Sequence, residues 1–298
     1  MDFQKLFNII YWDLNIYYFQ LKILINLKEL KKTCKKWNLY WNYNKIIKLD
    51  INSNLIKYNK HKKMMCVENI IYLKKRATDI YFNFGYTLLY LNCGYTKITK
   101  IPKSLVNLIK LKCDNCKRLK KIPPISSLKI LNCAYTKLEY IPDSLVNLEK
   151  LNCSHCYHLI KIPNIKTLKK LYCDDTKIKK IPKNLNCLVE LNCAFTNINE
   201  IPETLECLKE LNCGNTNISK IHETLNCLEK LYCWDCKNLT KIPKIKTLKI
   251  LNCSFTPINK ISKNLICLEE LYCDICKNLK KIPNIKTLKI IKNIKLFN

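Results

Sequence analysis

Residues 88–107 read LLYLNCGYTKITKIPKSLVN, and residues 108–127 read LIKLKCDNCKRLKKIPPISS. Both stretches carry the spacing Leu-x-x-Leu-x-Cys, and the cysteine recurs every 20 residues from Cys93 to Cys273. Ten full units occupy residues 88–287, and a truncated eleventh unit occupies residues 288–298. Because a unit of this length cannot bury its own apolar face, the sequence predicts units that stack on one another as a repeat solenoid.

Each unit predicts a short strand followed by an extended return. The second leucine and the cysteine, which we call the ladder leucine and the ladder cysteine, are two residues apart and so point to the same side of a strand. Eight of the ten units carry proline after this strand, and proline discourages a long helix. We therefore expect a parallel sheet on one side of the solenoid and extended chain on the other.

Two versions of the unit share this frame. A Thr-type unit has threonine three residues after the ladder cysteine, as at Thr96, whereas a Cys-type unit has a second cysteine there, as at Cys116. From residue 88 the order is T, C, T, C, T, T, T, C, T, C. Segments 236–250 and 276–290 are nearly identical, which indicates duplication in blocks of forty residues.

The Cys-type units contain Cys-x-x-Cys, a spacing that also occurs in zinc sites. Threonine, a poor zinc ligand, replaces the second cysteine in the other units, and the repeat length rather than tetrahedral geometry sets the spacing between pairs. We therefore interpret the ladder cysteines as buried packing residues, and we predict no metal, no cofactor and no disulfide. The same packing role is expected for the cysteines that precede the first leucine of a unit, namely Cys187, Cys207, Cys227 and Cys267.

The pattern Leu-x-x-Leu-x-Cys-x-x-Thr/Cys, followed by Ile-Pro, resembles the leucine-rich repeat. Cysteine replaces the third leucine of that family's pattern, and threonine or cysteine fills its usual asparagine position. The resemblance implies an α/β repeat solenoid: a right-handed superhelix with a concave parallel β-sheet, a mostly extended or 3₁₀ convex side and a helical N-terminal cap. Eleven strands at a spacing of about 4.8 Å would give a sheet about 50 Å long.

Residues 1–50 lack the repeat and place apolar residues at helical spacing. The stretch from Leu27 to Trp37 resembles the second half of an F-box, although no Leu-Pro opening precedes it. An F-box docks on the adaptor of cullin–RING ubiquitin ligases while the adjoining repeats select the substrate, which implies docking roles for Leu27, Leu30, Cys34 and Trp37. The alternative is a plain helical cap over the first edge of the sheet. Residues 51–87 are expected to form a transition with degenerate repeats.

The charge and the amino-acid composition indicate what kind of protein this is. The formal net charge is +30, but Arg76 and Arg118 are the only arginines among 53 basic residues, and A/T-rich codon usage explains much of the lysine excess. Together with the F-box-like segment, this composition resembles the leucine-rich-repeat families of large DNA viruses that infect amoebae.

No apolar run is long enough to span a membrane, and no secretion signal opens the chain. We expect an intracellular protein in a reducing compartment, the host cytoplasm if it is viral.

Little in the sequence supports catalysis. Three glycines leave no glycine-rich phosphate loop, and four histidines form no recognisable Ser/His/Asp or Cys/His arrangement. We therefore predict that the protein is not an enzyme.

The outward positions of the strands carry the candidate functional residues. Aromatic side chains on a rigid face are typical anchors for protein partners, whereas the alternative is that some of them pack against neighbouring units. The predicted partner-binding residues on the concave face are Tyr95, Tyr135, Tyr172, Phe195, Tyr232, Trp234, Phe255 and Tyr272.

A second set of exposed side chains is basic. Lysines gather where the chain leaves each strand, as at Lys97, Lys100 and the segment 177–183, and Glu200 and Glu203 interrupt the series. This rim is either a solvated edge or a weak binding surface for nucleic acid or another polyanion. The sequence thus favours a protein–protein interaction scaffold, with an F-box-type substrate receptor and a polyanion binder as alternatives.

Overall fold

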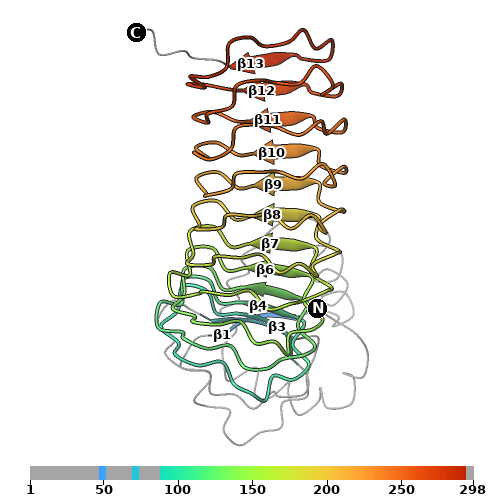
Figure 1. The fold of residues 1–298 in the computed structure, drawn as a ribbon. Coiled ribbons are helices and arrows are strands. Elements are labelled where there is room, and N and C mark those ends of the chain that lie inside the picture. The colour runs from blue at the N-terminus through green and yellow to red at the C-terminus, as the bar shows by residue number, and fades with distance from the viewer. Residues whose placement is uncertain (1–46, 52–68, 74–87, 293–298) are drawn as a thin grey trace, which may run out of the picture. The chain divides into compact units, whose positions relative to one another are not determined.

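The computed structural model describes residues 47–51, 69–73 and 88–292. The chain divides into two compact units, Met1–Asn44 and Lys45–Asn298, and every described residue belongs to the second. The described residues form 13 β-strands, which lie side by side in a single sheet in the order of the sequence (Figure 1). The strands are β1 (Ile47–Ile51), β2 (Asn69–Leu73), β3 (Leu88–Asn92), β4 (Lys110–Lys112), β5 (Ile130–Asn132), β6 (Lys150–Asn152), β7 (Lys170–Tyr172), β8 (Glu190–Asn192), β9 (Glu210–Asn212), β10 (Lys230–Tyr232), β11 (Ile250–Asn252), β12 (Glu270–Tyr272) and β13 (Ile290–Lys292).

Every strand pairs with the next in parallel, and the register repeats the sequence period. Leu191 of β8 faces Leu171 of β7 and Leu211 of β9, each 20 residues away. The parallel-sheet solenoid predicted from the 20-residue unit is therefore confirmed. Each side chain of a strand is aligned with its equivalents in the neighbouring turns, so every position of the unit becomes a column.

The sheet also continues before the first unit that the repeat pattern identifies. Strands β1 and β2 add to the eleven strands expected, with Leu49 facing Ile71 and Ile71 facing Leu91, and the register shifts between Asn69 and Ile70. Strand β2 lies within residues 51–87, where degenerate repeats were expected, whereas β1 begins inside the segment 1–50 that was expected to be helical. Neither strand has the Leu-x-x-Leu-x-Cys spacing. The rest of the segment 1–50 that was expected to be helical, including Leu27 to Trp37, lies outside the described residues.

Each Thr-type turn buries the same six apolar positions, and each Cys-type turn adds its second cysteine and places the next two apolar residues one position later. In the turn that begins at residue 188 these side chains are at most 1% exposed: Leu188, Leu191, Cys193, Ile198, Ile201 and Leu205. The chain returns to the next strand through turns and extended segments, and residues 88–292 contain neither an α-helix nor a 3₁₀-helix. Proline explains this return, since its fixed φ favours extended chain and it cannot donate a helical hydrogen bond.

Threonine and cysteine close the turn after each strand in different ways. The Thr96 hydroxyl donates to the carbonyl of Cys93 in its own unit at 2.6 Å. The Cys116 thiol instead donates to that same carbonyl, which belongs to the preceding unit, at 2.9 Å. A Cys-type unit therefore ties its turn to the unit before it, whereas a Thr-type unit satisfies its own carbonyl.

Fourteen of the eighteen cysteines among the described residues are buried, and all eighteen are free thiols. This arrangement agrees with the packing role predicted for the ladder cysteines. The same prediction was wrong for Cys187, Cys207, Cys227 and Cys267, which are exposed. These four residues lie in the turn just before a buried leucine, and the turn directs their side chains outward.

Brief treatment of the folded protein with a water-soluble maleimide should modify Cys187, Cys207, Cys227 and Cys267 and spare the ladder. Burial raises the pKa of ladder thiols such as Cys113 and Cys173, so they remain protonated as well as inaccessible. Peptide mapping by mass spectrometry after a timed quench measures the modification site by site. Equal labelling of Cys173 would contradict the packing, and protein unfolded in guanidinium is the control in which all thiols react.

Candidate functional site

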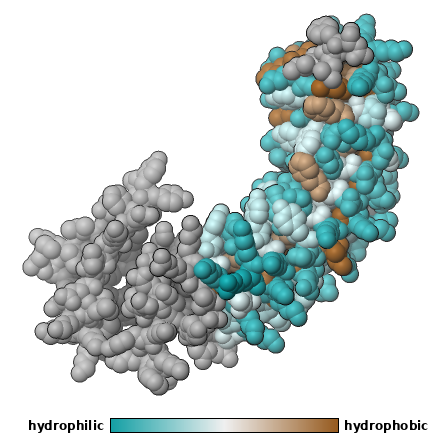
Figure 2. Space-filling view, turned by 90° about the vertical axis from the view of Figure 1, so that its left-hand side faces the viewer, coloured by the Kyte–Doolittle hydropathy of each residue, from teal (hydrophilic) through white to brown (hydrophobic). Residues whose placement is uncertain are grey.

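The outward side of the sheet presents four columns, which together we call the sheet face. The first column precedes the ladder leucine and the second follows it. The third column follows the ladder cysteine, and the fourth lies one residue further on. Figure 2 views the solenoid from the side on which the strands end, where brown apolar areas are separated by teal hydrophilic ones. Apolar and polar side chains therefore alternate over this side of the solenoid.

The fourth column has a left-handed backbone in all ten units, with φ between 52° and 62°. Asparagine and aspartate tolerate this conformation, but for other side chains it costs roughly 1–2 kcal/mol. Hydrogen bonds to the next turn hold it, as from the N–H of Phe195 to the carbonyl of Gly214 at 2.9 Å. The column consists of Tyr95, Asn115, Tyr135, His155, Asp175, Phe195, Asn215, Asp235, Phe255 and Ile275.

This backbone points aromatic side chains into solvent. Tyr95 and Phe195 are 58% and 52% exposed, and Tyr135 and Phe255 are also exposed. Two of them also contact another turn. Tyr135 stacks on His155 of the next turn with ring centroids 4.1 Å apart, and Phe195 meets Trp234, two turns on, edge-on at 5.1 Å. Both interpretations of the aromatic residues, outward display and packing against the next unit, therefore hold for part of the set.

The other four predicted residues, Tyr172, Tyr232, Trp234 and Tyr272, are half-buried. The fold brings three of them together and leaves Tyr272 aside. Tyr172, Tyr232 and Trp234 line a cavity of about 200 Å³ over β7 to β10, which we call the acidic hollow. Its complete lining is Tyr172, Glu190, Leu191, Asn192, Glu210, Asn212, Tyr232 and Trp234.

Two glutamates from the first column form the acidic part of this hollow. Glu190 and Glu210 face each other on adjacent parallel strands. Lys170 lies 2.6 Å from Glu190, and Lys230 lies 3.2 Å from Glu210, so each carboxylate is ion-paired on the side away from the other. Facing carboxylates repel each other, and the two flanking lysines offset this repulsion.

Tyr172 holds Glu190 from the second column. Its hydroxyl donates to Glu190 Oε1 at 2.5 Å, and burial together with this bond raises the pKa of Tyr172. Burial alone would raise the pKa of Glu190, but hydrogen bonds from Lys170 and Tyr172 outweigh it and hold the pKa below its ordinary value of 4.5. Glu190 is therefore a carboxylate at neutral pH.

Trp234 reaches the hollow because residue 214 is glycine. A Cβ at position 214 would lie 2.3 Å from Cε2 of Trp234, which is far inside van der Waals contact. The missing side chain lets the indole lie against the backbone of the preceding turn. Gly214 is one of only three glycines in the chain, and its N–H donates to Asn212 Oδ1 at 3.2 Å.

Sequence reasoning missed Glu190 and Glu210. It considered the second, third and fourth columns but not the first. Glutamate in two successive units was the available signal, since lysine or isoleucine occupies most of this column. The two glutamates form a site together with residues that are 18 to 24 positions away in the sequence. The register of the parallel strands brings these residues next to the glutamates in space.

A ladder of alternating charges runs beside the first column, one residue earlier in each unit. Glu149 lies 3.6 Å from Lys129 and 2.8 Å from Lys169, and Glu229 lies 3.8 Å from Lys209 and 2.8 Å from Lys249. The four lysines of this ladder are therefore paired across turns. Exposed pairs of this kind add little stability.

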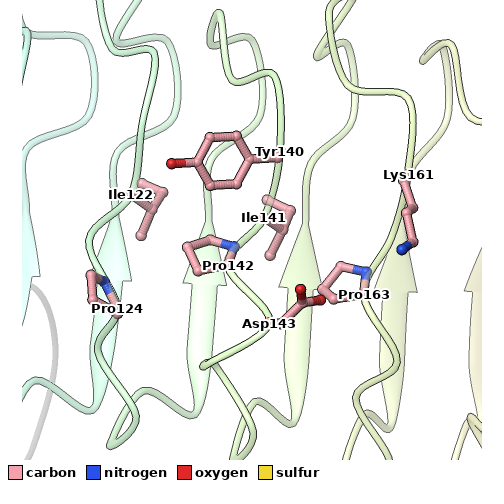
Figure 3. A pocket seen from close by; sticks show the side chains of 8 residues that line it. All are labelled: Ile122, Pro124, Tyr140, Ile141, Pro142, Asp143, Lys161 and Pro163. Carbon is pink, nitrogen blue, oxygen red and sulfur yellow. The ribbon is translucent and has the colours of Figure 1, made fainter.

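A second cavity of about 400 Å³ lies on the return side of the solenoid. Figure 3 shows Pro124, Pro142 and Pro163 from three successive turns around it, with the strands behind. Lys161 and Asp143 are its only charged lining residues. Three prolines and two isoleucines make most of this lining apolar, and none of the predicted partner-binding residues lies in it.

The part of the chain that the structure describes contains neither a group of side chains that could hold a metal ion nor a membrane-spanning helix. No three histidine, cysteine, aspartate or glutamate side chains among residues 88–292 are grouped to hold an ion. No helix of the described residues is long and apolar enough to cross a bilayer.

No protein-family model and no curated protein matches this sequence. Solved structures do match it. A leucine-rich-repeat protein of Leptospira interrogans superposes with a TM-score of 0.69 at 20% identity, over 83% of this chain and 73% of that one. The functional domain of InlJ from Listeria monocytogenes, which includes a cysteine ladder, gives 0.69 at 22%, over 83% and 62%.

YopM from Yersinia enterocolitica gives a TM-score of 0.60 at 20% identity, over 76% of this chain and 50% of that one. The chain thus spans about half of YopM and under two thirds of the InlJ domain. Identities this low show a shared fold and nothing finer. The chain folds as a leucine-rich-repeat solenoid built from 20-residue turns.

Proposed function

We propose that this protein is a non-enzymatic interaction scaffold that binds a protein partner on its sheet face. The observation that carries the proposal is the fourth column, where backbone strain holds aromatic side chains in solvent at Tyr95, Tyr135, Phe195 and Phe255. Strain that persists at exposed positions is a reason to look for function there. Large aromatic side chains are also the usual anchors of protein interfaces.

The rigidity of the solenoid supports the same proposal. Backbone hydrogen bonds join the fourth column of each turn to the next, as from Tyr135 N–H to the carbonyl of Ser154 at 2.9 Å. Side chains held in place before binding lose little conformational entropy on association. Alternating polar and aromatic columns further allow the face to combine apolar anchors with hydrogen bonds.

The other interpretations of the sequence remain predictions. Docking on a ubiquitin-ligase adaptor rests on Leu27, Leu30, Cys34 and Trp37, which lie outside the described residues. Polyanion binding by the lysine rim, an intracellular location and a viral origin likewise rest on the sequence. If polyanion binding reflects charge alone, nucleic-acid affinity should fall steeply between low and physiological salt without sequence preference.

Replacing Tyr135, Tyr172, Phe195 and Tyr232 together by alanine should reduce partner capture from eukaryotic lysate by at least about tenfold, as expected when interface anchors are removed. The matched control replaces exposed apolar residues in the turns that precede the strands: Val106, Val146 and Ile266. Capture is measured by quantitative mass spectrometry, and circular dichroism verifies that both variants are folded. Partners retained by the sheet-face variant, or lost equally from the control, would contradict the proposal.

A further inference from the structure

We infer that the acidic hollow binds an arginine side chain presented by the partner. This inference rests on the proposed function, because it names the chemistry that the sheet face recognises. The hollow combines two facing carboxylates, Glu190 and Glu210, with the aromatic side chains of Tyr172, Tyr232 and Trp234. Carboxylates and aromatic faces are the two groups that a guanidinium ion binds best.

The carboxylates keep capacity for a further donor. A carboxylate has about four acceptor positions. The contacts described above use two positions on Glu190, for Lys170 and Tyr172, and one on Glu210, for Lys230. Since adjacent strands are about 4.8 Å apart, a planar group with donors on two edges can reach both carboxylates at once.

The aromatic residues of this face already bind cations within the protein. The ammonium group of Lys150 lies 5.2 Å from the centre of the Tyr172 ring, and that of Lys292 lies 5.5 Å from the Tyr272 ring. Trp234 is the strongest cation–π partner among the aromatic types, and Gly214 allows its indole to lie beside the hollow. The aromatic side chains can thus stack on the plane of the guanidinium, while the N–H groups at the edges of the guanidinium donate hydrogen bonds to the glutamates.

Charge favours a cationic occupant over an anionic one. The protein carries +30 overall, yet five carboxylates lie on the sheet face in and around the hollow. These residues are Asp174, Asp175, Glu190, Glu210 and Asp235. Lys170, Lys230 and Lys237 pair with three of these carboxylates, which leaves the patch weakly negative on a basic protein. A basic partner is therefore repelled less here than elsewhere on the surface, which orients its approach.

Arginine fits this arrangement better than lysine does. A lysine ammonium is a compact, strongly hydrated point charge, whereas the guanidinium is planar, more weakly hydrated and forked. Only the guanidinium can bridge two carboxylates and stack on an aromatic side chain in one pose. Citrulline keeps the planar shape but lacks the charge, so it separates stacking from charge recognition.

The test uses the full chain labelled with ¹⁵N-glycine, which yields three backbone signals, from Gly85, Gly94 and Gly214. The probes are the peptides acetyl-Gly-Gly-Xaa-Gly-Gly-amide, with arginine, lysine or citrulline as Xaa. The Gly214 signal should shift saturably with the arginine peptide, with a Kd of about 1 mM. The Gly94 signal, from the same column six strands earlier at β3, should stay fixed. The lysine peptide should bind at least about fivefold more weakly, and citrulline should not bind.

Variants separate recognition from folding. Glu190→Gln combined with Glu210→Gln, and separately Trp234→Ala, should each weaken the arginine peptide at least about tenfold. Glu270→Gln, in the same column at β12, is the matched control and should not. Because the pKa of Glu190 lies below 4.5, binding should hold from pH 7 to 5 and fall as lower pH protonates that carboxylate. Circular dichroism at each pH tests whether the fold persists.

Three results would overturn the inference: a Gly214 signal that does not shift, equal shifts with all three peptides, or full binding by the double glutamine variant. Its failure is distinguishable from failure of the proposed function. If the arginine peptide does not bind while the aromatic variant still loses its partner, the sheet face binds by other chemistry. If the peptide binds but partner capture survives the four alanine substitutions, the hollow accepts arginine and the partner docks elsewhere.

Discussion

Replacing Leu191 by alanine should lower the free energy of unfolding by about 3 kcal/mol. Its side chain is 1% exposed and lies between Leu171 and Leu211 in the middle of the sheet. Truncation therefore removes buried apolar surface and opens a cavity that the flanking turns, held by their own hydrogen bonds, cannot fill. Urea titration followed by far-UV circular dichroism measures the change.

The same column supplies a matched control. Ile291 occupies the ladder-leucine position of β13, the last strand that the structure describes, and is 52% exposed. Ile291→Ala should therefore cost well under 1 kcal/mol, as expected for surface substitutions. If both substitutions cost the same, burial by the neighbouring turns would not be the source of the stability.

Replacing Cys193 by leucine should destabilise the protein by about 2 kcal/mol, although leucine is the usual residue of the leucine-rich-repeat pattern at this position. Cys193 is fully buried, and Cys173 and Cys213 occupy the same position in the adjoining turns. A core packed around a column of small thiols has no volume for two additional carbon atoms. Accommodating leucine would require strained rotamers or a shift of the strands.

Cys193→Ala provides the comparison in the other direction. It removes one sulfur atom without adding volume, so its cost should be about 1 kcal/mol. Thermal denaturation should therefore rank wild type first, the alanine variant second and the leucine variant last. A leucine variant more stable than wild type would show that the cysteine column leaves unfilled space.

The period of the ladder residues was sufficient to predict the core and the parallel sheet. Leucine and cysteine that recur every 20 residues allow the turns to stack in only one register. Proline after each strand excludes a helical return segment. Strands β1 and β2 could not be found in the same way. Their pairing is made by backbone hydrogen bonds, which do not require leucine at any particular position.

The site was predictable only in part. The aromatic residues were visible as outward positions, but the hollow depends on which columns lie next to each other in space. Trp234 over Gly214 is a contact between residues 20 positions apart, and the Tyr172–Glu190 hydrogen bond joins residues 18 apart. Cys187 shows a second limit of prediction from the sequence. It directly precedes a buried leucine, but this position does not tell in which direction the turn points its side chain.

The thiol that reaches back to the preceding turn has a consequence for how such a protein evolves. Each Cys-type unit in the described chain follows a Thr-type unit, and its second cysteine bonds to a carbonyl of that unit, as Cys156 does to Cys133 and Cys276 to Cys253. A copied Cys-type unit placed after another would separate this thiol from its threonine neighbour. A Thr-type unit and the Cys-type unit after it can therefore be copied together, so the gene can lengthen by forty codons while every new junction repeats one already present.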